Sequence, residues 1–150
     1  MSIKQQIDQD LKQAMLAGDK TLVTTIRGLK GSILNAEIAS GQREAGLPDD
    51  QVLQLLAKEA KKRQESADLY EQGGNSEKAA AELAEKQVIE QYLPKQLNDD
   101  ELGAIVDAVV AGMGGVTQQT MGQAIGQVRA KAGNQADGGR IAAAVKERIA

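Results

Sequence analysis

Several residue types are missing from this chain or nearly so. It has no cysteine, no histidine, no phenylalanine and no tryptophan, and only two tyrosines and two prolines. Without cysteine there can be no disulfide and no thiolate nucleophile, and without histidine the commonest metal ligand and general base is absent. The core must therefore be built from Ala, Leu, Ile, Val and Met, which favours helices over sheets. We predict an all-α protein.

Long apolar runs are missing as well. No stretch of eighteen consecutive apolar residues occurs, and the first twenty residues carry a charge in nearly every helical turn. A transmembrane helix needs about twenty apolar residues, and a secretory signal needs an apolar stretch of about seven to fifteen. We expect a cytoplasmic protein that does not span a membrane.

Catalytic motifs are also absent. No phosphate-binding loop, no serine nucleophile elbow and no dinucleotide fingerprint occurs in the sequence. The acidic run Asp99, Asp100 and Glu101 follows Asn98, a position typical of a helix N-terminus, where carboxylates complement the backbone amides. We therefore expect no cofactor, no metal and no catalytic residue, and an enzyme that acts on a small substrate is kept as a third hypothesis.

Glycine, proline and capping residues divide the chain into seven expected helices. Their approximate ranges are 2–17, 20–41, 48–72, 76–93, 99–111, 121–132 and 138–149. Helix starts are indicated by the capping boxes Ser2 to Gln5 and Asn98 to Glu101, and by Asp19 and Asp137. The expected apolar stripes include Ile38 in the second helix, Ala80 and Ala84 in the fourth, and Ile149 in the last.

The stretch YLPKQL, residues 92–97, predicts a stiff joint between subdomains. Pro94 cannot donate a helical hydrogen bond and disfavours the helical conformation of Leu93, so the fourth helix is expected to end there. We expect the Tyr92 ring to cover apolar surface at this joint and its hydroxyl to reach water or a backbone carbonyl. The predicted boundaries are residues 1–93, a joint at 94–97, and a compact three-helix subdomain at 98–150.

Charge is distributed unevenly along the chain, whose net charge is −3. Residues 113–150 hold five basic side chains against Asp137 and Glu147, which suggests that this end contacts a phosphate backbone. Because Phe and Trp are absent, base stacking cannot dominate, and folded RNA is favoured over single strands. A solvated helical surface is the alternative interpretation. The candidate RNA-binding residues are Arg129, Lys131, Arg140, Lys146 and Arg148, and Arg140 and Lys146 are expected on the solvated face of the last helix.

Several segments together resemble a known family. They are LKQAM (11–15), IRGLK (26–30), KEAKKRQES (58–66), EQYLPKQL (90–97), MGQAIG (121–126) and ADGGRI (136–141). This combination, which spans essentially the whole chain, is similar to the GatB/YqeY family. The resemblance implies a long-helix amino-terminal part and a compact three-helix carboxy-terminal part. It also implies kinship with the tail of the tRNA-dependent amidotransferase B subunit, which touches the tRNA body and performs no chemistry.

Two functional hypotheses follow. The first is a non-catalytic, tRNA-associated accessory module that contacts folded RNA through its basic carboxy-terminal part. The second is a protein-interaction adaptor, in which the long third helix and its neighbours present a groove to a partner and the basic end serves solubility only.

Overall fold

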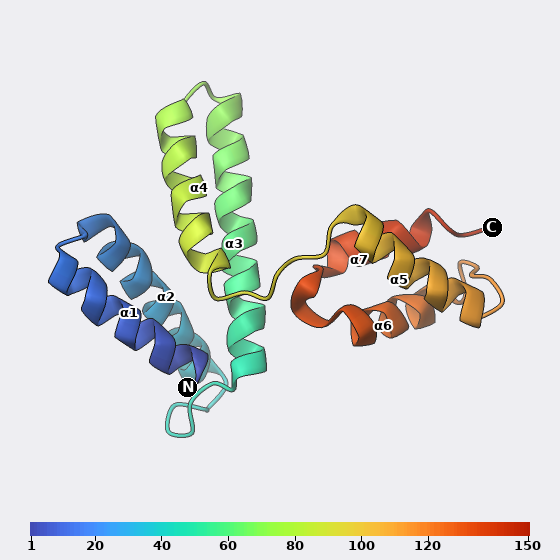
Figure 1. Ribbon diagram of the computed structural model, residues 1–150, viewed down its shortest axis with the longest axis horizontal. Helices are drawn as coiled ribbons and strands as arrows, with labels where there is room; N and C mark the ends of the chain where they lie inside the picture. The colour runs from blue at the N-terminus through green and yellow to red at the C-terminus, as the bar shows by residue number, and fades with distance from the viewer. The chain divides into compact units, whose positions relative to one another are not determined.

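The computed structural model describes residues 1–150 and consists of helices joined by short loops (Figure 1). The prediction of an all-α fold is confirmed: the single β-type contact is an isolated bridge between Val116 and Ile149. No helix has the length and the apolar content that crossing a bilayer requires. The elements are α1 (Ile3–Ala17), α2 (Lys20–Ala39), α3 (Asp49–Gln72), α4 (Ser76–Glu90), α5 (Asp99–Gly112), α6 (Met121–Ala132), the 3₁₀ turn η1 (Gly133–Gln135) and α7 (Gly138–Lys146).

The chain divides into two compact units, Met1–Leu93 and Pro94–Ala150, and each has its own hydrophobic core. In the first unit, α1 and α2 form one antiparallel hairpin and α3 and α4 form another (Figure 1). In the second unit, α6 packs against both α5 and α7. These units are called unit 1 and unit 2 below.

Side chains close the helix ends where the sequence predicted them. The Ser2 hydroxyl accepts from the Gln5 amide and the Gln5 side chain accepts from the Ser2 amide, which completes a capping box. Asn98 and Glu101 repeat this arrangement at the start of α5. Asp19 and Asp137 cap α2 and α7 by accepting from backbone amides three residues further on.

Two predicted apolar stripes are wrong only in part: Ile38 of the second helix and Ala80 and Ala84 of the fourth do not face the core. Ile38 is 59% exposed, and the residue that α2 buries at this level is Glu37. On α4, Ala80 and Ala84 are exposed while Ala79 and Ile89 are buried. The four-residue spacing of the alanines was misleading because the face that α4 turns toward α3 also carries Glu82 and Glu85. Both carboxylates lie near Arg63 of α3.

Two helices end three residues earlier than predicted. The last helical residue of α4 is Glu90, because the amides of Tyr92 and Leu93 bond to carbonyls three residues back and tighten the chain into a turn. The last helical residue of α7 is Lys146, and Ile149 instead pairs its backbone with Val116. The three residues after each of these helix ends make other backbone contacts, and these contacts decide where the helix ends.

The residues on both sides of Pro94 form hydrogen bonds within their own units. Tyr92 packs on the core of unit 1, and its hydroxyl donates to the Asp10 carboxylate of α1 at 2.6 Å. The expectation of water or a backbone carbonyl as its partner was therefore wrong. In unit 2, the amide of Leu97 donates to the Gln135 carbonyl and the Gln135 side chain donates to the Lys95 carbonyl. The segment 95–97 thus lies along the turn that follows α6.

Candidate functional site

Two of the five candidate RNA-binding residues are already engaged by acidic side chains. Arg140 donates to Asp99 at 3.0 Å, and Arg148 donates to Asp107 at 2.6 Å. Asp99 and Asp107 are eight residues apart on α5, and Arg140 and Arg148 are also eight residues apart. The two ion pairs are therefore separated by the same number of residues on both segments. Arg140 is half-buried, and its expected place on a solvated face was wrong.

Gly103 explains how α5 comes so close to the second of these arginines. A Cβ atom at this position would lie 3.2 Å from Nη2 of Arg148, which is closer than such contacts usually are. The glycine therefore leaves room for the guanidinium between Asp99 and Asp107. Arg140 on α7 and Arg148, two residues beyond its end, therefore contact α5 through packing as well as through charge.

The other three candidates form no ion pair within the chain. Arg129, Lys131 and Lys146 are exposed, and neither Arg129 nor Lys131 has an acidic neighbour on its own helix, because α6 carries no Asp or Glu. The Arg129 guanidinium lies over Gly138, where a Cβ atom would lie 2.5 Å from Nη2 and would displace the end of this flexible side chain. A glycine at the first position of α7 therefore allows this arginine to lie across the end of the helix.

Lys131 also belongs to a shallow hollow between α5 and α6. Gln123, Gln127 and Lys131 follow one another at four-residue spacing, so they line the same face of α6. The hollow has a volume of about 350 Å³ and is completed by residues of α5, the glycine-rich loop and the first turn of α6: Ala108, Val109, Gly112, Met113, Gly115 and Thr120. Its one charged residue is basic. The sequence reasoning missed this hollow, although the four-residue spacing could have indicated it.

Unit 2 as a whole is not basic. The excess found in residues 113–150 is balanced by acids on α5, so that residues 94–150 contain six basic and six acidic side chains. Four of these acids are in α5, at positions 99, 100, 101 and 107. The positive character is therefore local, on α6, and is not a property of the whole unit.

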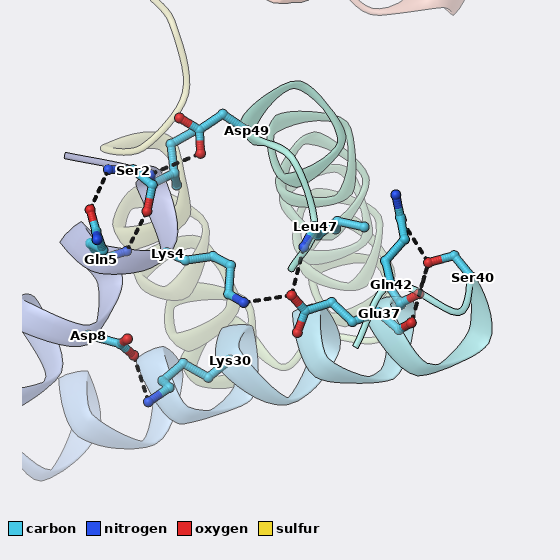
Figure 2. A network of polar contacts seen from close by, with 12 residues as sticks. Ser2, Lys4, Gln5, Asp8, Lys30, Glu37, Ser40, Gln42, Leu47 and Asp49 are labelled. Carbon is cyan, nitrogen blue, oxygen red and sulfur yellow. Dashed lines mark hydrogen bonds and ion pairs between the residues drawn. The ribbon is translucent and has the colours of Figure 1, made fainter. Parts of the chain in front are cut away.

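Unit 1 contains a buried carboxylate that organises its loop. Figure 2 shows Glu37 accepting from Lys4 Nζ at 2.6 Å and from the Leu47 amide at 2.7 Å. Only 3% of the Glu37 side chain is exposed. The Lys4 hydrogen bond first, and the Leu47 amide second, lower the pKa of Glu37, whereas burial alone would raise it. This carboxylate fastens the 41–48 loop to α1 and α2.

A second polar cluster lies between α3 and α4. Nε of Arg63 lies 2.8 Å from a carboxylate oxygen of Glu85 and 3.8 Å from one of Glu82. Arg63 also lies 3.8 Å from Glu59, one turn earlier on α3, and Lys62 approaches Glu59 at 3.5 Å. The basic run of the third helix is therefore partly consumed within unit 1.

Comparison with known proteins gives two matches. A family model described as Yqey-like protein matches residues 4–149. The chain is also similar to "Altered inheritance of mitochondria protein 41, mitochondrial" of Eremothecium gossypii, with 36% identity over 104 residues. That alignment covers 68% of this chain and 56% of the relative, so the chain spans little more than half of the relative's length.

Proposed function

Because this chain belongs to the YqeY-like family, as the match over residues 4–149 shows, we propose that it is a non-catalytic accessory module that contacts folded RNA of the tRNA class through unit 2. Family membership confirms the resemblance found in the sequence motifs. The RNA contact is the part that goes further, and the resemblance to the amidotransferase tail supports it.

The observation that carries this proposal is the acid-free surface of α6. Arg129 and Lys131 project from it without an ion-pair partner, and Lys146 at the end of α7 is likewise unpaired. Phosphate contacts need cations that are not already neutralised, because the gain comes from replacing counterions on the nucleic acid. Arg140 and Arg148 are paired with Asp99 and Asp107 of α5, so they are less available to a phosphate.

The preference for folded RNA follows from where the aromatic side chains lie. Both tyrosines are in unit 1, and Tyr92 is bound to Asp10. Unit 2 therefore has no aromatic surface on which an unpaired base could stack. A folded backbone with fixed phosphates is the ligand that suits a few cations and the amide side chains of Gln123 and Gln127.

A salt titration tests this function. Fluorescence anisotropy with a labelled, folded tRNA transcript should show modest affinity, with a slope of about two to three in log affinity against log salt, since about 0.9 is expected per phosphate contact. Changing Arg129 and Lys131 together to Gln should remove about two contacts and most of that slope.

The matched control is the double change of Lys58 and Lys61 to Gln, which removes the same charge from exposed positions of α3. It should leave RNA binding close to that of the wild type. Binding that does not depend on salt, or an equal loss in both double variants, would contradict a site on α6. An unstructured RNA of equal length that binds as tightly as the folded transcript would contradict the preference for folded RNA.

A further inference from the structure

Helix α2 has two apolar stripes, and unit 1 uses only one of them. Ile26, Leu29 and Ile33 are buried in the core. Gly31, Leu34 and Ile38 lie on another side of the helix at three- and four-residue spacing, and Leu34 and Ile38 are 37% and 59% exposed. This spacing is typical of a seam between two packed helices. No element of unit 1 covers it.

Gly31 has no explanation within the chain. It lies in the interior of α2, where glycine is among the poorest helix formers. A Cβ atom at this position would meet no atom within 4 Å, so the glycine does not make room for any part of unit 1. Its φ is not positive, so the backbone does not require glycine either. A glycine here leaves space for something from outside to approach the helix closely.

A hollow of about 370 Å³ adjoins this stripe, between α1 and α2. Gly31 and Leu34 form part of its wall, and Ile7 and Ile33 contribute apolar surface. Both lysines that line it are neutralised, as Figure 2 shows: Lys4 by Glu37 and Lys30 by Asp8. Arg43 also lines the hollow but forms no ion pair.

Two cations at this surface form no ion pair. Arg27 precedes Gly31 by one turn on the same side of α2, is exposed and forms no ion pair. Arg43 supplies a second guanidinium at the hollow; it forms no ion pair, although it helps to lower the pKa of Glu37. Both carboxylates that line the hollow, Asp8 and Glu37, are already taken by lysines. A partner that covers this surface must therefore bring its own carboxylates.

We infer that the outer face of α2, formed by Arg27, Gly31, Leu34 and Ile38 together with Arg43 of the following loop, docks an amphipathic helix of a partner protein. The stripe from Arg27 to Ile38 is about 16 Å long, which corresponds to roughly three turns of the incoming helix. That helix carries aliphatic residues at three- and four-residue spacing and carboxylates at both ends. A second copy of this face brings arginines and no acid, so self-pairing through it is disfavoured. The surface belongs to unit 1 and is independent of the RNA contact of unit 2.

The test uses two labelled, stapled helical peptides of about sixteen residues with identical Leu spacing. One has Glu near both ends and the other has Lys. Anisotropy should show saturable binding of the Glu peptide to the full chain, at least about tenfold tighter than that of the Lys peptide, and the difference should shrink at high salt.

Gly31→Gln should weaken binding of the Glu peptide by at least about tenfold while keeping or raising the melting temperature, because Gln is the better helix former. Gly126→Gln is the matched control: this glycine is also exposed within a helix with no atom near its Cβ position, and it lies in unit 2. It should leave peptide binding unchanged. Ile38→Ser tests the apolar contact in the same assay.

Three results would overturn the inference: no saturable binding of the Glu peptide, equal affinity for both peptides, or equal effects of Gly31→Gln and Gly126→Gln. Sedimentation velocity tests whether a second copy of the chain occupies this face instead. Concentration-dependent dimers that Gly31→Gln abolishes would assign the face to a second copy of the chain and would also overturn it.

Discussion

The two units bury different kinds of residue. Unit 1 buries Thr25, Glu37 and Glu59 in addition to its apolar core, whereas every fully buried residue of unit 2 is apolar. Unit 1 is held partly by directional bonds, because Glu37 ties a loop to two helices. Unit 2 is held by apolar burial, and its ion pairs lie at the surface. One chain thus stabilises two helical units by different means, which should respond differently to pH and to truncation of the core.

The largest effect is expected in the core of unit 2. Ile141 is fully buried on α7, so Ile141→Ala should lower the free energy of unfolding by about 2–5 kcal/mol through lost burial and the cavity left behind. Urea denaturation followed by NMR should show unit 2 losing its dispersed signals first. Ile141→Val is the conservative control and should cost about 0.5–1.5 kcal/mol. Simultaneous loss of both units would show that they unfold as one, and the comparison would fail.

The next effect concerns the buried carboxylate of unit 1. Glu37→Gln should cost about 1–3 kcal/mol at pH 7, because the charged partner of Lys4 is lost. Because the folded-state pKa of Glu37 is lowered, its contribution is present above the unfolded value of about 4.3 and is lost as the pH falls through the folded value. Melting temperatures of the wild type and the variant should therefore converge in acid.

The control for this experiment is Asp8→Asn, which breaks the pair with Lys30. About half of each of these two side chains is exposed, so the change should cost less than about 1 kcal/mol. A gap between wild type and Glu37→Gln that stays constant down to pH 3 would show that the charge of Glu37 contributes nothing. Unit 1 would then resemble unit 2 in its mode of stabilisation.

A smaller effect is expected at the end of unit 1. Tyr92→Phe removes the hydrogen bond to Asp10 and should cost about 1 kcal/mol. Burial first, and the bond to Asp10 second, raise the pKa of Tyr92. In a pH titration followed by absorbance, the phenolate signal that is present in the wild type and missing in Tyr92→Phe should therefore appear only above the usual pKa of about 10. Asp10→Asn keeps an acceptor but removes the charge, so it should move that absorbance to lower pH. If the absorbance that Tyr92→Phe removes instead appears near the usual pKa of about 10, the contact with Asp10 would be contradicted.

The smallest effect separates two basic residues of α7. Arg140→Gln breaks the pair with Asp99 and should lower the stability of unit 2 by about 0.5 kcal/mol or less, since Asp99 is almost fully exposed. Lys146→Gln removes an unpaired cation and should change nothing measurable. Thermal unfolding at low and at high salt should show the difference disappearing at high salt. Equal effects of the two changes would mean that the α5–α7 pair does not contribute to the stability of unit 2.

Local signals predicted the helices well because their causes are local. Ser2, Asp19, Asn98 and Asp137 each cap the helix that the sequence assigned to them, and Gly18 adopts the left-handed conformation with φ of 72° that ends α1. A cap needs only the amides two or three residues away, so a short window of sequence contains it. The positions where helices leave the regular conformation near residues 90 and 147 were harder, since distant contacts compete there.

The candidate site was only partly predictable for the same reason. Counting charges in residues 113–150 identified the basic side chains but not their partners, which come from α5. Nothing in the local sequence around Arg140 or Arg148 reveals Asp99 or Asp107, 41 residues away in each case. Equally, the exposure of Ile38 and the burial of Glu37 depend on where α1 and the 41–48 loop pack.

The sequence by itself determined the class of this protein: the absence of Phe, Trp, cysteine and histidine leaves aliphatic helices, and capping residues set where most of them begin. Tertiary structure alone decided which cations remain free. Arg140 and Arg148 are neutralised by α5 while Arg129 and Lys131 are not, and on α2 one apolar stripe is covered while the other is left open. The physical reason is range: a cap or a helical period acts within one or two turns, whereas neutralising a charge or covering a side chain requires residues that only folding brings together.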